Sequence, residues 1–299
     1  MNKIELKRQS FKKGASGLKK ITIIEPECYC CPLCKRLFVA QAVDEGILTI
    51  EHAPPEKVGG TPLALTCKDC NSVSGYTIDA AVVEREKLID AAKAITGQRR
   101  NYEGRATLKM GDELINVRIE VNEGAISIKP PLNINDPKKL TAYIDYMMYL
   151  HKEGKWDGET FNIKPMASFK NKYSRIGDLK SAFIVSFAKF GYKYVLSKQL
   201  SPVREQILNY DSDIIDKYWL SSDQKIDHKY FICILDEPVS AVAIKLDKAT
   251  VLLPWFGSPG NFYQYLEHNF QDEKQLSFHG SFLKWPESLE MEMDFFKNI

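Results

Sequence analysis

Two pairs of cysteines constrain the fold of this chain more than any other feature, because Cys-x-x-Cys spacing brings two thiols together at one turn. The pairs are Cys31/Cys34 and Cys67/Cys70. Six of the seven cysteines lie in residues 28–70, whereas a disulfide-rich secreted protein would spread them more evenly. Four thiolates suit tetrahedral Zn²⁺, so we predict a structural zinc ion held by both pairs.

A further Cys-x-x-Cys pair, Cys28/Cys31, overlaps the first. We favour Cys31/Cys34, since the Lys-Arg-x-Phe sequence that follows it is typical of a zinc knuckle, and this choice leaves Cys28 and Cys30 without a ligand role. Redox chemistry is the competing use of such a pair. A redox pair normally starts a helix in a βαβ unit, and the sequence here lacks that pattern.

The segment between the two cysteine pairs is longer than the roughly 15–20 residues of a simple zinc ribbon, so it must hold structure of its own. Two apolar runs, residues 46–50 and 62–66, flank a turn rich in proline and glycine and predict a β-hairpin. A helix is expected after Cys70. Residues 76–95 have helical apolar spacing without Gly or Pro, and Gly97 follows them as a helix end.

The rest of the chain mixes strand and helix patterns and predicts an α+β fold. Residues 104–130 alternate in hydrophobicity around two turns, at residues 111–112 and 122–124, as in a small antiparallel meander. Further elements are predicted as helices over 137–152, 179–190 and 193–210, strands over 20–24, 230–235, 241–246 and 250–253, and a helix and last strand after residue 261.

The chain has 299 residues, 44% of them hydrophobic and 27% charged, which suits about two globular domains. We predict a basic flexible arm over 1–20, a first domain over 21–97 and an α+β C-terminal domain over 98–299. No apolar run approaches the ~18 residues of a membrane helix, and the polar N-terminus lacks the core of a signal peptide. We therefore expect a cytoplasmic protein without a membrane partner.

Charge is unevenly distributed along the chain. The net charge is only +2, but nine Lys and Arg residues stand against three Glu residues before residue 40. Such a basic segment either contacts nucleic-acid phosphates or forms a solvated, partly disordered tail. The sequence leaves both interpretations open.

His52, which follows Glu51 directly after the first apolar run, is the first candidate for chemistry. A histidine can accept a proton near neutral pH, and phosphodiester hydrolysis needs an activated water and a neutralised phosphate. A buried structural histidine is the alternative. Asn71 is either a metal ligand or the cap of the following helix. Cys233 and the Trp255-Phe256 pair are predicted to belong to the core.

The Glu51-His52 pair, the EHxPP…GG…LTCxxCN pattern and the flanking cysteine pairs resemble the HNH endonuclease family over residues 28–80. The resemblance implies a treble-clef ββα-metal domain stapled by zinc. It implies His52 as the general base, and Glu51 and Asn71 as ligands of a catalytic Mg²⁺ or Mn²⁺ distinct from the zinc.

This chain departs from the family pattern in the supporting residues. The middle asparagine of the family would fall near Thr61, and the hydroxyl of Thr61 is predicted to support the histidine instead. Glu51 stands where the family often has Asp, and Asp79 is a candidate to complete the metal site. Four basic side chains near the motifs are predicted to contact nucleic acid: Lys35, Arg36, Lys57 and Lys68.

The resemblance implies an endonuclease that hydrolyses DNA, with RNA as the other candidate substrate, and suggests a role in bacterial restriction or anti-phage defence. The C-terminal domain would then recognise the target, a regulatory protein or a small-molecule activator. A zinc-dependent nucleic-acid-binding module without catalysis is the second hypothesis, since the middle asparagine is missing. A dithiol redox protein is the third, and only the cysteine cluster of residues 28–34 argues for it.

Overall fold

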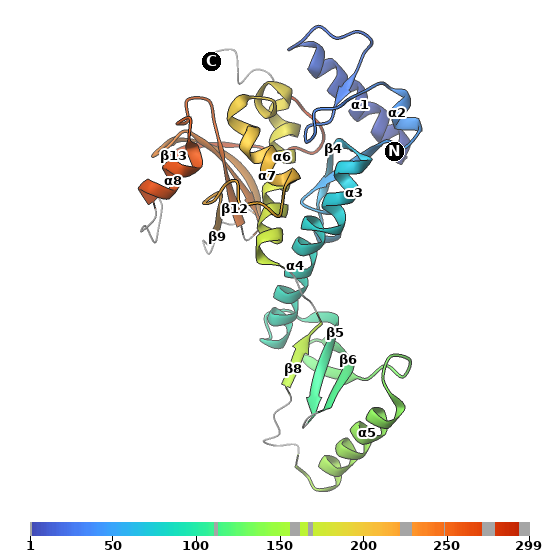
Figure 1. The fold of residues 1–299 in the computed structure, drawn as a ribbon. Helices are drawn as coiled ribbons and strands as arrows, with labels where there is room; N and C mark the ends of the chain where they lie inside the picture. The colour runs from blue at the N-terminus through green and yellow to red at the C-terminus, as the bar shows by residue number, and fades with distance from the viewer. Residues whose placement is uncertain are drawn as a thin grey trace. The chain divides into compact units, whose positions relative to one another are not determined.

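The computed structural model describes residues 2–110, 113–155, 162–166, 170–221, 229–247, 249–270 and 279–292. The chain forms two compact units (Figure 1), each with its own hydrophobic core. Unit 1 comprises Met1–Val83 and Lys170–Ile299, and unit 2 comprises Glu84–Phe169. These units differ from the predicted domains, 21–97 and 98–299. The chain leaves unit 1 at residue 83, forms unit 2 and returns to unit 1 at residue 170.

Helix α1 (Lys3–Lys19) replaces the flexible arm that we predicted for residues 1–20. The side chain of Asn2 caps it by accepting hydrogen bonds from two backbone N–H groups, and the helix buries Phe11, Ala15 and Leu18. Gly14 permits this packing, since a Cβ there would lie 2.2 Å from the ring of Tyr29. Residues 20–24, predicted as a strand, form a turn and irregular backbone instead.

The cysteine region of unit 1 confirms the predicted hairpin and places a helix directly after it. Strands β3 and β4 pair antiparallel, with a register shift between Glu51 and His52. The elements in order are β1 (Tyr29–Cys30), β2 (Leu37–Phe38), α2 (Gln41–Asp44), β3 (Leu48–Ala53), the short 3-10 helix η1 (Glu56–Val58), β4 (Thr61–Cys67), α3 (Lys68–Tyr76) and α4 (Ile78–Ile95).

Helix α6 (Asn171–Val195) is the central element of unit 1, and it is buried along most of its length. It contacts the β3–β4 hairpin and also strands β11 and β12 of a five-stranded antiparallel sheet with strand order β13-β10-β11-β12-β9. Gly191, with φ of 70°, kinks the helix where two helices were predicted. The remaining elements are η2 (Lys198–Leu200), α7 (Ser201–Leu208), β9 (Trp219–Ser221), β10 (Tyr230–Glu237), β11 (Ala241–Leu246), β12 (Ala249–Pro254), α8 (Phe262–Phe270) and β13 (His279–Leu283).

Unit 2 contains a four-stranded antiparallel sheet with strand order β7-β6-β5-β8. The strands are β5 (Asn101–Met110), β6 (Glu113–Asn122), β7 (Ala125–Lys129) and β8 (Asn162–Pro165), and helix α5 (Pro137–Lys152) supplies Tyr143 and Met147 to its core. The predicted meander, the predicted helix over 137–152 and the α+β class are confirmed. The predicted turn at residues 111–112 lies outside the described residues. No helix within the described ranges is both long and apolar enough to cross a membrane.

Helices α4 and α6 approach each other closely at Gly177 in unit 1. A Cβ at this position would lie 2.5 Å from Cγ2 of Val82 and 2.7 Å from the carbonyl oxygen of Ile78. We expect Gly177→Ala to lower the free energy of unfolding by about 1–3 kcal/mol, because the two helices must separate. Urea unfolding measures this change. Gly75→Ala is the matched control, since a Cβ there meets no atom within 4 Å; an equal loss in both variants would contradict the close-approach explanation.

Candidate active site and metal centre

The four predicted cysteine ligands meet in one cluster. The sulfur atoms of Cys31, Cys34, Cys67 and Cys70 all lie within 4.8 Å of one another. Cys34 Sγ and Cys67 Sγ are 3.7 Å apart. Tetrahedral zinc with Zn–S bonds of about 2.3 Å places its sulfur ligands roughly 3.8 Å apart. The donor set and its spacing therefore fit a metal ion such as zinc.

Local backbone geometry explains how the two pairs converge. The carbonyl of Cys31 accepts a hydrogen bond from the N–H of Lys35, which has a left-handed φ of 62°, so the chain turns tightly around the first pair. Cys67 ends strand β4 and stands at the N-cap of α3, and Cys70 lies one turn into that helix. The second pair is thus fixed by a strand-to-helix junction, whereas the first is fixed by a turn.

Arg36 lies against the cysteine cluster rather than facing solvent alone. Its guanidinium donates to Cys34 Sγ at 3.3 Å and to Cys67 Sγ at 3.0 Å, and it forms an ion pair with Asp69 at 2.7 Å. A hydrogen bond from the Cys31 thiol, opposed by burial and reinforced by Arg36, lowers the pKa of Cys34 to about 6. A thiolate at neutral pH is the form that binds a metal.

Cys28 and Cys30 stay outside the cluster, as we predicted. The thiol of Cys28 donates to the carbonyl of Pro26, and the thiol of Cys30 donates to backbone carbonyls. Burial raises the pKa of Cys30 to about 11, so this group remains a protonated thiol. Cys30 therefore does not offer the thiolate that metal binding or dithiol redox chemistry needs.

His52 lies on strand β3 at the register shift, opposite Pro62 of strand β4. Its side chain is half-buried, and its ring nitrogens make no hydrogen bond or ion pair within the part of the chain that the structure describes. Thr61, predicted to support the imidazole, pairs instead with Ala53, and no hydrogen bond joins it to His52. The imidazole is therefore accessible and makes no polar contact with the described residues. The hydrogen bond that we predicted from Thr61 is not formed.

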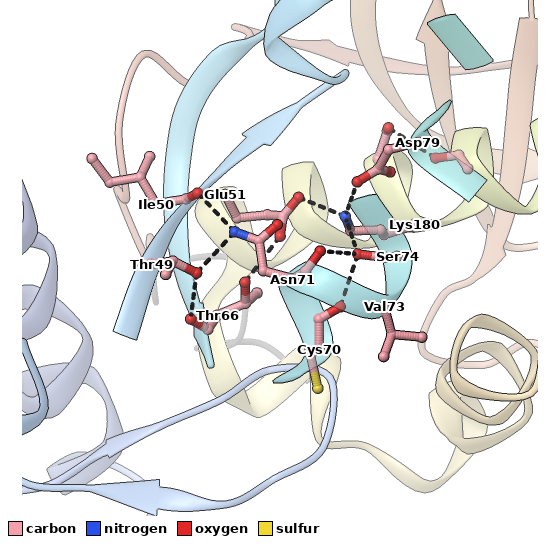
Figure 2. A network of polar contacts seen from close by, with 12 residues as sticks. Thr49, Ile50, Glu51, Thr66, Cys70, Asn71, Val73, Ser74, Asp79 and Lys180 are labelled. Carbon is pink, nitrogen blue, oxygen red and sulfur yellow. Dashed lines mark hydrogen bonds and ion pairs between the residues drawn. The ribbon is translucent and has the colours of Figure 1, made fainter. Parts of the chain in front are cut away.

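Glu51 points into a buried polar network (Figure 2). It is 3% exposed, and its two carboxylate oxygens have different partners. One oxygen forms an ion pair with Nζ of Lys180 at 2.7 Å, and the other accepts a hydrogen bond from the hydroxyl of Thr66 at 2.9 Å. Lys180 comes from helix α6, far along the chain, and its side chain is 2% exposed.

The Lys180 ammonium has three partners. Besides Glu51 it contacts Asp79 at 2.6 Å and the hydroxyl of Ser74 at 2.8 Å (Figure 2). Burial opposes its charge, but the attraction of the two carboxylates is larger in sum, so the pKa of Lys180 is raised. Burial raises the pKa of Asp79 to about 6 despite the attraction of Lys180. The ammonium is thus held charged between two acidic side chains.

Asn71 connects helix α3 to strand β3. Its side-chain amide donates to the hydroxyl of Thr49 at 2.8 Å and to the carbonyl of Ile50 at 3.3 Å. Its side-chain oxygen accepts no hydrogen bond within the described residues. Asn71 lies inside α3, which begins at Lys68, so it is not the cap of that helix.

Of the two residues predicted to bind the catalytic ion, Asn71 can act as a ligand in this structure and Glu51 cannot. The side-chain oxygen of Asn71 is open to a hard cation. Glu51 does not fit in this arrangement, because the Lys180 ammonium already neutralises it and Thr66 occupies its other oxygen. A divalent ion at Glu51 would have to displace a buried positive charge. Asp79, the other predicted contributor, is paired with the same ammonium.

The remaining predicted nucleic-acid contacts are exposed on the surface of unit 1. Lys35 lies in the turn of the first cysteine pair, Lys57 lies in η1 and Lys68 begins α3. Within the basic N-terminal segment, Lys7 donates to the carbonyl of Leu48 at 2.8 Å and Arg8 pairs with Asp44 at 3.0 Å. Part of that positive charge therefore binds the protein itself.

Sequence reasoning missed Lys180, the residue that joins the site to the C-terminal half of unit 1. The sequence does contain a signal for it, because Lys180 lies within an apolar helical segment that belongs to the core. A lysine in such a run needs a buried partner. The sequence does not indicate which of its many carboxylates that partner is.

Comparisons with known proteins identify no relative of this chain. No protein-family model, no curated protein and no solved structure matches it.

Proposed function

We propose that this chain is an HNH-type endonuclease that hydrolyses DNA phosphodiester bonds, with His52 as the general base. The observation that supports this most is the setting of His52. Its unengaged imidazole lies on a hairpin that a four-cysteine cluster and a buried ion network fix on either side. General-base catalysis needs a base that is held in position, and here the anchored strand β3 supplies that position through the backbone of His52. The EHxPP and CxxCN motifs add the family resemblance.

In the proposed reaction, a ring nitrogen of His52 takes the proton of a water molecule as the water attacks phosphorus. Exposed lysines near the hairpin, Lys57 and Lys68, would contact the flanking phosphates. Glu51 supports strand β3 through its buried contact with Lys180 and so orients the histidine beside it. We thus assign Glu51 a positioning role.

Two metals belong to this proposal in different roles. Zinc on the four cysteines would join the turn of Cys31 and Cys34 to the end of β4 and the first turn of α3. Mg²⁺ or Mn²⁺, when bound, would neutralise charge on the phosphate, and the side-chain oxygen of Asn71 would supply one of its ligands. On the same resemblance we propose a cytoplasmic role in restriction or anti-phage defence.

The test is plasmid nicking by purified wild type and His52→Ala with Mg²⁺ or Mn²⁺. Losing a general base should slow cleavage by about 10²–10⁴-fold. His268→Ala is the control, because His268 is exposed on α8. This variant should cleave DNA as fast as wild type does. Equal cleavage by wild type and His52→Ala would refute His52 as the base.

A nucleic-acid-binding module without catalysis is the second candidate. Two observations favour it: the Lys180 ammonium neutralises Glu51, and no hydrogen bond joins Thr61 to His52. The same plasmid assay separates the candidates. Binding of DNA without nicking, with either metal and at high protein concentration, would support the module and count against the nuclease.

A further inference from the structure

The outer face of the unit 2 sheet carries an arrangement of charge that neither the core nor the proposed active site uses. The inner face packs Ala106, Leu108 and Val117 into the core with α5, so the alternate residues of each strand point outward. Seven charged side chains lie on the outer face of the described strands, five basic and two acidic: Arg105, Lys109, Arg118, Lys129, Lys164, Glu103 and Glu120.

Like charges lie directly opposite one another across these strands. Arg118 pairs in register with Arg105 on one side and with Lys129 on the other, which makes a row of three cations across β7, β6 and β5. The next row holds Glu103 opposite Glu120. Like charges directly opposite each other destabilise a sheet. The cationic row therefore needs negative charge from outside its own row.

The two glutamates neutralise only part of the cationic row. Arg118 forms an ion pair with Glu103 at 3.3 Å, and Lys129 forms one with Glu120. The side chains of Arg105, Lys109 and Lys164 make no ion pair within the described part of the chain. Lys164 lies opposite Thr107, so it is diagonal to both other cations, at Cα separations of about 7–8 Å.

The triangle formed by Arg105, Lys109 and Lys164 has dimensions that suit a duplex. Arg105 and Lys109 are four residues apart on one strand, which corresponds to roughly 14 Å between their Cα atoms. That span is close to the ~12 Å width of the major groove, so the two side chains can reach phosphates on both of its rims. All three side chains are exposed.

We propose that this outer face, defined by Arg105, Lys109 and Lys164, binds the phosphate backbone of duplex DNA. Positive charge in excess matches a polyanion. The outer positions of the described strands include no aromatic residue, and single-stranded nucleic acid is usually held by aromatic stacking. The choice of DNA over RNA rests on the proposed nuclease function, whereas the backbone contact itself does not.

The test measures binding of a short DNA duplex to the full chain by fluorescence anisotropy, without Mg²⁺ or Mn²⁺, over a series of salt concentrations. The variant is Arg105→Gln/Lys109→Gln/Lys164→Gln. Each lost phosphate contact should reduce the slope of log affinity against log salt by about 1, so the slope should fall by about 3 and affinity should drop for every sequence.

The control is Lys138→Gln/Lys152→Gln/Lys155→Gln, which removes the same charge from unit 2 on and after α5. It should bind as wild type does. The proposal is overturned if both triple variants weaken binding equally or if the first variant binds as wild type does. It is also overturned if single strands or RNA duplex bind more tightly than DNA duplex, or if polyglutamate competes equally well. This experiment measures binding and not cleavage. If the wild type binds DNA but does not nick plasmid, the nuclease proposal fails and the proposal of a DNA-binding surface is unaffected.

Discussion

Replacement of Lys180 by methionine is expected to lower the free energy of unfolding by about 3–5 kcal/mol, the usual result of removing one partner from a buried ion pair. Methionine preserves most of the side-chain volume but leaves Glu51 and Asp79 buried without their cation. Chemical denaturation with urea measures the change. The proposed DNA cleavage should fall as well, since the strand that carries His52 loses its anchor.

A compensated variant separates lost charge pairing from lost packing. Glu51→Gln/Asp79→Asn/Lys180→Met removes all three charges together, and neutral replacement of a complete buried network is often tolerated. This triple variant should recover most of the stability that Lys180→Met loses. If it is no more stable than Lys180→Met, the ammonium is not held mainly by the two carboxylates.

Removal of one cluster ligand by Cys67→Ser is expected to release the metal and unfold the segment around the hairpin. Structural zinc contributes on the order of 10 kcal/mol in small zinc domains, which is comparable to the whole stability of a typical protein. Purified wild type should contain one zinc ion per chain and Cys67→Ser almost none. Elemental analysis measures the metal, and circular dichroism with limited proteolysis follows the unfolding.

Cys30→Ser is the control for this prediction. Cys30 is also buried and lies beside the cluster, but its thiol donates to backbone carbonyls. The variant should keep one zinc ion per chain even if it loses some stability. Full zinc content in Cys67→Ser, or loss of zinc in Cys30→Ser, would contradict the assignment of Cys31, Cys34, Cys67 and Cys70 as the ligands.

The N-terminal helix shows where composition misled the prediction. Lysines and two glycines dominate residues 3–19, and both favour a solvated segment. Phe11, Ala15 and Leu18 nevertheless repeat at helical spacing and form a narrow apolar stripe. Gly14 is small because a ring of Tyr29 packs against it, not because the segment needs flexibility. Whether a glycine provides flexibility or close packing depends on the residue that packs against it, and the sequence does not show that residue.

The sequence by itself determined the features that depend on near neighbours along the chain. The cysteine pairs, the hairpin between them and the meander of unit 2 follow from short spacings and alternating hydrophobicity, and the structure places them as predicted. Thiols at Cys-x-x-Cys spacing meet at one turn whatever the rest of the fold does.

Tertiary structure alone decided what surrounds Glu51. Lys180 reaches Asp79 across 101 residues of sequence and meets Glu51 in the same network, because helix α6 packs between the hairpin and the five-stranded sheet. An apolar helix that contains a lysine indicates that a buried partner must exist, since an unpaired buried charge is too costly. Which carboxylate serves depends on how distant elements pack, and local sequence carries no record of that packing.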